Sequence, residues 1–304
     1  MRRQLGWTVL CLGLLSSLAD ADDIKHSFFI AGPTFTGIIG ENGEEVWNAG
    51  KPAARDGFVL PNGNILIAWN EEVRELTRGK ETVFHYKLSP DNKELGTVER
   101  LANGRTLITE LGGKPRLLEV AADGKIAVEC PLQPETDNGH MQTRMARKLP
   151  SGNYLVPHLF AFAVKEYAPT GEVKQIFKTD LEELGGRAAE NWPFTAIRLD
   201  NGHTLVNLTH GNKAVEFDPS GKVVWKVSND DFPKEKPFDD ACGGQRLPNG
   251  NTVICAYHAT GTAIKVFEVT PEKKLVWTYR GPHRAHEIQV LTTNGKPVEG
   301  RPLK

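Results

Sequence analysis

The sequence predicts an all-β protein, a six-bladed β-propeller with four antiparallel strands in each blade. A short apolar run, an Asn-Gly-type turn and a second apolar run occur together six times, as in LPNGNILIAW and LPNGNTVICA. The turn glycines of successive copies are separated by 41, 48, 50, 48 and 45 residues. A strand-turn-strand repeat with a period of about 40–50 residues is typical of one propeller blade per copy.

Two turns per copy account for the four strands of a blade. The first turn contains a glycine, which accepts the positive backbone φ of a tight hairpin. These glycines are Gly63, Gly104, Gly152, Gly202, Gly250 and Gly295. A second turn, rich in Pro, Asn, Asp and Gly, follows between segments of alternating apolar and polar residues. We expect these second turns at 41–43, 90–92, 122–124, 169–171, 219–221 and 271–273.

The two ends of the sequence predict how the ring closes. The segments before residue 48 lack a first strand, whereas the sequence ends shortly after the turn at Gly295. We expect one blade to combine an innermost strand from the C-terminal end with strands from about residues 28–48. Closure by N- and C-terminal strands that share one blade leaves no free sheet edge.

Two residue types recur at fixed places in the repeat. Trp47, Trp225 and Trp277 fall on expected outermost strands, and a glutamate recurs before the second turn, as at Glu216 and Glu268. Because these positions repeat from blade to blade, we expect the tryptophans to pack blade against blade and the glutamates to be structural.

Charge and the N-terminal sequence restrict the class of protein. The net charge of −1 offers no general attraction to nucleic acid or to anionic membranes. Residues 1–21 have the features of a signal peptide, because Arg2 and Arg3 precede an apolar stretch that ends in a small-x-small cleavage site. We expect a single propeller domain over residues 22–304, no membrane span in the mature chain, and a periplasmic or secreted location.

Four cysteines are present, and Cys11 lies within the expected signal peptide. Three remain in the mature chain, so at most one disulfide can form. Cys242 and Cys255 flank one predicted hairpin. A disulfide between them and a pair of buried free thiols both agree with this placement.

Loop lengths predict which face of the ring carries a site. In a propeller, the connections between second and third strands and those between blades lie on one face. We expect long, varied connections there, at 70–82, 131–145, 178–194, 228–244 and 280–286, whereas the turns of the other face are short. Long loops on a rigid scaffold are the usual place for a binding site. We therefore expect this long-loop face to bind a small molecule, a sugar or a peptide.

Six of the nine histidines fall on the long-loop face. Four of them lie next to expected innermost strands and are predicted to converge on the channel mouth: His140, His210, His258 and His286. The further candidates for contact with a ligand on this face are His158, Arg55, Arg144, Glu287, Asp239 and Asp240.

Imidazoles that converge on a channel mouth suit two kinds of chemistry. Neutral ring nitrogens bind transition metals, and an imidazole can act as nucleophile or general base towards an acidic phenol or a sulfate ester. A third interpretation is a set of scattered loop histidines with ordinary hydrogen-bond partners. No HxxxH-type spacing supports a metal, and the three interpretations remain open.

Parts of the repeat resemble two known propeller groups. HEIQVLTTNG from His286, CGGQRLPNGNTVIC from Cys242 and RMARKLPSGNYLV from Arg144 are similar to the arylsulfotransferase-type propeller, in which a His precedes a Gln and an L-P-N-G-N turn. DPSGKVVWKV from Asp218 resembles the repeat of pyrroloquinoline-quinone-type propellers. The resemblance covers most of residues 28–296.

The arylsulfotransferase resemblance implies an exported enzyme with a histidine at the channel mouth that carries sulfate transiently. In this chain His286 would be the nucleophile or base, His210 and His258 its partners, and Arg144 an anion clamp. A related hydrolase or lyase is the wider expectation. The alternatives are a non-catalytic propeller that binds a ligand or a protein, and a metal-binding propeller that uses the same histidines. The quinone-type rings look larger, with eight blades and an adjacent-Cys motif, so we expect no quinone cofactor here.

Overall fold

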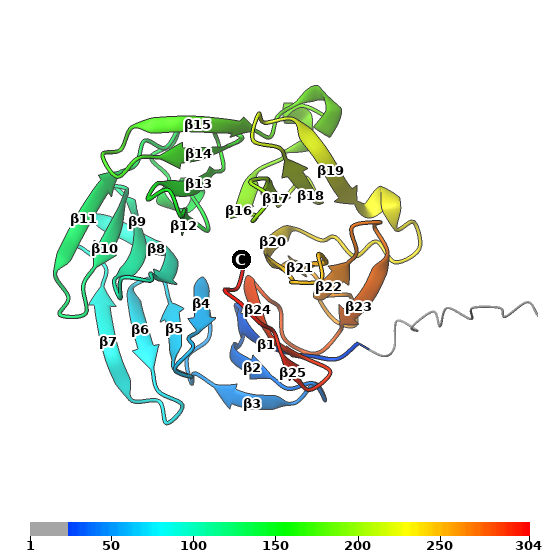
Figure 1. The fold of residues 1–304 in the computed structure, drawn as a ribbon, viewed down its shortest axis with the longest axis horizontal. Helices are drawn as coiled ribbons and strands as arrows, with labels where there is room; N and C mark the ends of the chain where they lie inside the picture. Colours follow the sequence, from blue (N-terminus) through cyan, green and yellow to red (C-terminus); the bar gives the residue numbers. More distant parts are fainter. Residues whose placement is uncertain (1–23) are drawn as a thin grey trace, which may run out of the picture.

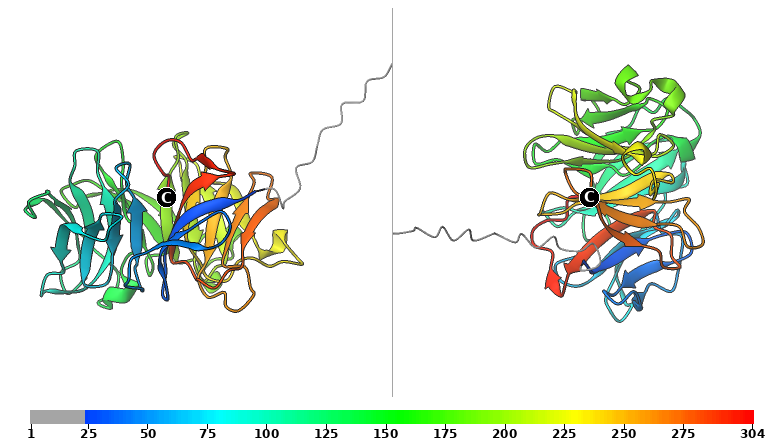
Figure 2. Two further views of the ribbon diagram at one scale, coloured as in Figure 1. Left: turned by 90° about the horizontal axis from the view of Figure 1, so that it is seen from below. Right: turned by 90° about the vertical axis from the view of Figure 1, so that its right-hand side faces the viewer.

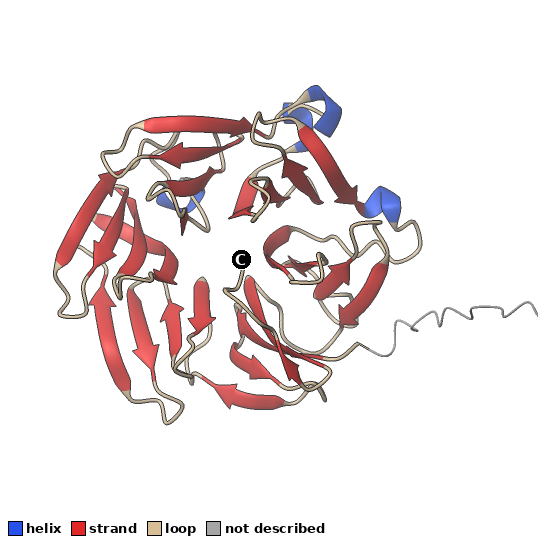
Figure 3. Cartoon of the chain, viewed as in Figure 1, coloured by secondary structure: helices blue, strands red, loops and turns tan. Residues whose placement is uncertain are grey.

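The computed structural model describes residues 24–304, which form six β-sheets arranged radially around a central channel (Figure 1). Five sheets have four antiparallel strands and one has five. Figure 3 shows that strands dominate and that the few helical turns lie in the connections. The expected all-β, six-bladed propeller is confirmed. The expected signal peptide lies outside the described residues.

Five blades are built from consecutive strands, which run from the channel to the outside. Blade 2 consists of β4 (Asp56–Val59), β5 (Ile65–Ala68), β6 (Glu72–Leu76) and β7 (Thr82–Lys87). Blade 3 consists of β8 (Asn92–Arg100), β9 (Thr106–Gly112), β10 (Arg116–Val120) and β11 (Ile126–Pro131). Blade 4 consists of β12 (Arg147–Lys148), β13 (Tyr154–His158), β14 (Ala163–Tyr167) and β15 (Val173–Lys178). Blade 5 consists of β16 (Pro193–Arg198), β17 (Thr204–Leu208), β18 (Lys213–Phe217) and β19 (Val223–Ser228). Blade 6 consists of β20 (Ala241–Arg246), β21 (Thr252–Ala256), β22 (Val266–Val269) and β23 (Leu275–Tyr279).

Blade 1 closes the ring with strands from both ends of the chain, as expected. Its innermost strand is β24 (Glu287–Thr293), which pairs antiparallel with β1 (His26–Ala31) and places Ile30 opposite Ile288. The blade continues through β2 (Thr36–Ile39) to β3 (Glu45–Asn48). A fifth strand, β25 (Lys296–Pro297), pairs with the other edge of β24. The chain then turns towards the axis, and its last residue lies at the centre of the ring (Figures 1 and 2).

The first turn of each repeat has the backbone that its glycine predicts. Gly63 and Gly250, for example, have φ values of 84° and 89°, in the left-handed region that glycine accepts readily. One predicted second turn was wrong. Residues 90–92 join β7 to β8, and the turn between β6 and β7 lies at 77–81. The prediction failed because a Pro-Asp-Asn sequence suits any tight connection and does not identify which strands it joins. As a result, the segment 70–82, which was expected to be a loop, contains strand β6.

Three of the long connections between blades carry short helical turns on the long-loop face. These are η2 (Gly139–Met141) before blade 4, η3 (Glu182–Leu184) and η4 (Arg187–Ala189) before blade 5, and η5 (Asn229–Asp231) before blade 6. The connection from β23 to β24, residues 280–286, has none. In the described part of the chain, no helix is long and apolar enough to span a membrane.

Blades are joined by apolar packing and by a repeated ion pair. Between blades 4 and 5, for example, Phe177 packs against Phe217 with ring centres 6.1 Å apart. The recurrent glutamates of the third strands each contact a basic residue of the next blade, and the Glu216–Arg246 pair is 2.9 Å apart. Trp225 donates its indole N–H to the Pro271 carbonyl of the next blade at 2.8 Å. The structural interpretation of these repeated residues is therefore confirmed.

The cysteines of the described chain are buried free thiols: Cys130, Cys242 and Cys255. Burial raises the pKa of Cys242 and of Cys255 well above the usual thiol value. Thiols with so little thiolate are poor nucleophiles, so we assign them no chemistry.

Candidate functional site

The long-loop face holds a cavity of about 200 Å³ at the channel mouth. It is lined by seven residues that the sequence singled out, namely Arg55, His140, Arg144, His210, Asp240, His258 and His286, and by others that include Trp192, Phe194 and Tyr257. A second hollow of about 200 Å³ adjoins it, because Arg55, His140, Tyr257 and His286 line both. The four histidines predicted to converge do share one cavity.

The propeller places these groups through the innermost strands, all of which begin at the long-loop face. One residue within three positions of the start of each innermost strand lies at the mouth: Arg55, Glu94, Arg144, Phe194, Cys242 and His286. His210 and His258 lie just beyond the ends of the second strands β17 and β21. Sites built from strand ends are held by the hydrogen-bond ladders behind them, so the mouth is a preorganised arrangement.

His286 is held in one tautomer. Its Nδ1 lies 2.8 Å from the carbonyl oxygen of Arg55, and because a carbonyl can only accept, Nδ1 carries the proton. The imidazole ring packs edge-on against Phe194 and Tyr257, with centroid distances of 4.8 and 5.3 Å. Nε2 therefore keeps its lone pair, and among residues 24–304 it has no hydrogen-bond partner.

The surroundings of His286 keep its ring neutral. Burial, followed by the positive charges of Arg55 and Arg144, lowers the pKa of His286 to about 3. At neutral pH the ring is consequently a base or a nucleophile, rather than a cation. The same two arginines create a positive potential at the ring, which favours an anion beside it.

Two arginines share one carboxylate on this side of the mouth. Arg55 donates to Glu94 at 2.9 Å and to Asn70 at 2.6 Å, whereas Arg144 lies 3.8 Å from Glu94. Burial alone would raise the pKa of Glu94, but its hydrogen bond to His140 and the charges of Arg55 and Arg144 lower it. Glu94 is thus ionised and neutralises one of the two arginines. The remaining positive charge is available to an anionic ligand.

Arg144 is the less solvated of the two arginines. Only 5% of its side chain is exposed, and burial together with the charge of Arg55 lowers its pKa to about 10. Its Nε is buried and has no partner within the described chain. The guanidinium also lies over the ring of Phe194, 5.7 Å from the centroid. Its two terminal nitrogens donate to the carbonyl oxygens of Thr143 and His140, so Arg144 acts on the cavity chiefly through its positive charge.

The opposite wall of the cavity is built around Asp240. Its carboxylate accepts from the Thr209 hydroxyl at 2.6 Å and lies 3.4 Å from Nδ1 of His258 and 3.8 Å from Nε2 of His210. Asp240 has a φ of 64°, unusual for a residue other than glycine, and its N–H donates to the Asn212 side chain at 2.6 Å. Backbone strain of this kind is found where a side chain has to be aimed at a site.

Three aromatic residues of the cavity were not predicted as site residues. Trp192 packs on His210 with a centroid distance of 4.1 Å, and Phe194 and Tyr257 enclose His286. Phe194 precedes its turn glycine by the same eight residues that separate Arg144 from Gly152, so the repeat held a signal for it. Trp192 and Tyr257 lie in irregular segments beyond the strand ends, where the repeat gives no such register.

The structure places two predicted ligand-binding residues away from the cavity. His158 is the last residue of β13 and is fully buried, with Nδ1 3.3 Å from Glu135 and Nε2 3.0 Å from the Tyr167 hydroxyl. Burial lowers its pKa, and both ring nitrogens already have partners. Glu287 faces the inside of the channel, because neighbouring residues of a strand point in opposite directions. Neither residue is retained in the site.

The described residues contain no group of three or more His, Cys, Asp or Glu side chains that could hold a metal ion. His210, His258 and Asp240 come together, but both imidazoles face the same carboxylate. We derive no step through a metal or a cofactor.

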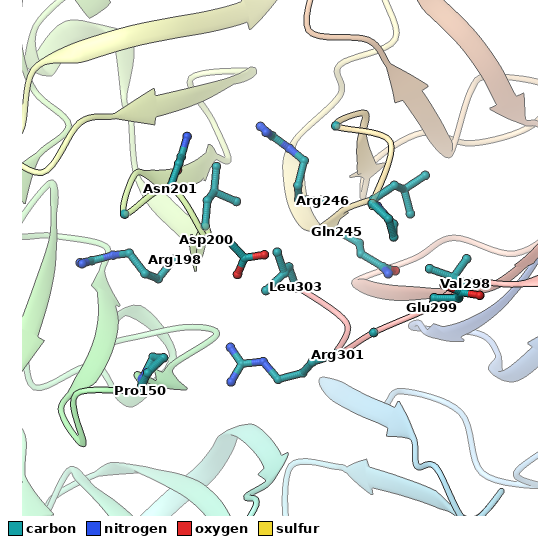
Figure 4. Close-up of a pocket in the computed structure, with 16 residues that line it drawn as sticks. Pro150, Arg198, Asp200, Asn201, Gln245, Arg246, Val298, Glu299, Arg301 and Leu303 are labelled. Carbon is teal, nitrogen blue, oxygen red and sulfur yellow. The ribbon is translucent and has the colours of Figure 1, made fainter.

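The largest of the described hollows lies on the other face, and Figure 4 shows its lining. It measures about 670 Å³ and lies between the first turns of blades 4 to 6 and the segment 298–303. Its Arg198 and Arg246 already form ion pairs with Glu166 and Glu216 at 3.1 and 2.9 Å. Because these two arginines already have partners, and the histidines that the sequence predicted line the cavity at the long-loop mouth, we place the candidate site there.

Comparisons with known proteins bear on the fold. The sequence matches no protein-family model, and no curated protein is similar to it. A protein of unknown function from Bacteroides caccae has a similar structure, with a TM-score of 0.75 and 22% identity over 87% of this chain and 98% of that one. A catalytically inactive variant of virginiamycin B lyase from Staphylococcus aureus, solved with quinupristin, has a TM-score of 0.57 and 14% identity over 90% and 87% of the two chains. The WD40 propeller domain of Doa1 has a TM-score of 0.53 and 13% identity over 90% and 81%. At these identities the likeness concerns the fold alone.

Proposed function

We propose that this protein is an exported enzyme that binds a small anionic substrate at the long-loop mouth and uses His286 as its base or nucleophile. One observation carries the proposal: a neutral imidazole, fixed by the Arg55 carbonyl, presents Nε2 to a cavity that is also lined by Arg55 and by the buried Arg144. The reaction class is hydrolysis, elimination or group transfer, in which an imidazole removes a proton or attacks an electrophile.

The charges at the mouth link substrate binding to catalysis. In the empty cavity the arginine charges help to depress the pKa of His286. An anion beside Arg55 and Arg144 offsets those charges and so raises the proton affinity of the ring. The substrate therefore strengthens its own base, because base strength follows pKa.

The opposite wall supplies the complementary role. His258 and His210 face the carboxylate of Asp240, so this wall carries two further imidazoles that line the same cavity as His286. Trp192, Phe194 and Tyr257 offer flat apolar surface for an aromatic part of the substrate. These features favour a substrate with an anionic group and an aromatic or apolar group.

An aryl sulfate is the first substrate to test, because the segment that begins at His286 resembles the arylsulfotransferase pattern. Nε2 of His286 would attack sulfur, the sulfur–oxygen bond to the aryl group would break, and the bond's electron pair would leave on the phenolate oxygen. The SO₃⁻ group on Nε2 would then pass to the oxygen of water or of an acceptor hydroxyl as the sulfur–nitrogen bond breaks, and the hydroxyl proton would go to the phenolate or to solvent. The likeness to virginiamycin B lyase adds only a fold-level analogy in favour of an enzyme.

The test is turnover of 4-nitrophenyl sulfate, with and without a phenol acceptor, followed by release of nitrophenolate. Loss of the essential base should lower kcat/KM by about 10²- to 10⁴-fold in His286→Ala. His283→Ala is the matched control, because His283 lies in the same connection but contacts Glu45 at 3.0 Å, outside the cavity. Equal turnover by His286→Ala would overturn the assignment. Ligand binding without any turnover by the wild-type protein would favour a non-catalytic propeller.

A further inference from the structure

The central channel contains a cluster of buried charges behind the mouth. Asp56 and Glu287 are fully buried, and Glu99, Arg147 and Lys304 are at most 9% exposed. Arg147 donates to the Asp56 carboxylate at 2.8 and 3.2 Å and lies 3.8 Å from Glu287. The amine of Lys304 lies 3.4 Å from Asp56 and 3.7 Å from Glu287.

The segment after β25 brings Lys304 into this cluster from the short-turn end of the channel. The N–H of Arg246 donates to the carbonyl of Leu303 at 2.9 Å, and Nε of Arg147 donates to the carbonyl of Lys304 at 2.7 Å. The Lys304 amine also lies 4.0 Å from the centre of the Phe58 ring. Residues 298–304 therefore enter the channel from this end and carry Lys304 to the buried carboxylates.

Strands β4 and β24 are linked at two places, once at the mouth and once in the channel. Asp56 follows Arg55 at the start of β4, and Glu287 follows His286 at the start of β24. The hydrogen bond from His286 to the Arg55 carbonyl joins these strand starts at the mouth. One residue further along each strand, the Lys304 amine lies between the two carboxylates.

We propose that Lys304 is a positioning residue for His286: its amine holds the starts of β4 and β24 at the separation that the His286–Arg55 hydrogen bond requires. The role of His286 rests on the function proposed above, whereas the positioning itself is a statement about geometry. Without the amine, Asp56, Glu287 and Glu99 share a single cation, Arg147. One oxygen of Glu287 is already buried without a hydrogen-bond partner in the described chain, so no spare donor replaces the lost amine.

The experiment compares Lys304→Met with wild type by ¹⁵N NMR of the histidine rings at neutral pH. Wild type should show His286 protonated on Nδ1 with a slowly exchanging ring proton. In Lys304→Met that proton should exchange at least about tenfold faster, and kcat/KM for 4-nitrophenyl sulfate should fall by about 10- to 100-fold. Lys296→Met is the matched control, because Lys296 lies on β25, is exposed, and has no contact with the cluster.

A second variant keeps the proposal testable if Lys304→Met folds poorly. Lys304→Met combined with Glu287→Gln removes one carboxylate together with the amine, and should restore most of the slow exchange and of the activity. An unchanged His286 ring signal in folded Lys304→Met, or no recovery in the double variant, would overturn the proposal. The ring signal needs no substrate, so an inactive wild-type protein would contradict the proposed function and leave this test intact.

Discussion

The anion-binding property of the mouth can be tested without knowing the substrate. Benzenesulfonate carries one negative charge throughout the relevant pH range, has an aryl ring, and cannot be cleaved by sulfate transfer. If its charge lies about 6 Å from the His286 ring, at an effective dielectric constant of about 20, it stabilises the protonated ring by about 3 kcal/mol. That energy corresponds to about a 100-fold rise in the proton affinity of His286.

The sign of the pH dependence follows from this linkage. The pKa of His286 is about 3 in the free protein, and the anion raises it. Between the free and bound values only the complex holds the proton, so binding takes up a proton and becomes tighter as the pH falls. We expect the affinity to be flat near neutral pH and about tenfold tighter at about pH 4.

The assay is isothermal titration calorimetry of benzenesulfonate at several pH values, with wild type and His286→Asn. The variant keeps the other histidines of the cavity, so the difference between the two proteins isolates His286. Proton uptake measured in two buffers of different ionisation enthalpy should be close to zero near neutral pH and rise in acid. Identical pH profiles for the two proteins would refute the coupling of His286 to an anion.

Two further predictions concern stability. Arg147→Met leaves Asp56 with Lys304 as its only cationic partner, so it should lower the free energy of unfolding by about 3–5 kcal/mol. The control is Arg105→Met, because the Arg105 side chain is 40% exposed, and it should lower the free energy of unfolding by only about 0–1 kcal/mol. Urea unfolding measures both, and equal losses would contradict the buried network. His158→Gln should cost about 1–3 kcal/mol, because it disturbs two buried hydrogen bonds, without changing benzenesulfonate affinity. A weaker affinity of His158→Gln for benzenesulfonate would instead show that His158 contributes to the site.

The repeat predicted the fold because the length of the repeat, its turn residues and its apolar runs all indicate the same four-stranded blade. The first-turn glycines, the recurrent tryptophans and glutamates, and the ring closure all depend on local patterns that repeat, and the structure shows each of them. The turn at 90–92 failed because turn composition does not say which two strands are joined. That error also lengthened one expected loop, at 70–82.

Several residues of the mouth were predictable from their distance to the repeat. Arg55 and Arg144 precede their turn glycines by eight residues and His286 by nine, and all three reach the cavity. The role of Glu94 depends on its contacts with Arg55 and His140, which lie 39 and 46 residues away, in the blade before it and in the connection to the blade after it. The entry of Lys304 into the channel depends on a path that no repeat describes. Three-dimensional contacts of this kind leave no periodic signal in a single sequence.

The most direct test of the central claim is a crystal structure of the protein with benzenesulfonate. The charges at the mouth predict the sulfonate beside Arg55 and Arg144, with one oxygen or a bridging water at Nε2 of His286, and the aryl ring against Trp192, Phe194 or Tyr257. Density for the ligand in the hollow of the opposite face, with an empty long-loop mouth, would contradict the claim that His286 and the two arginines form an anion site.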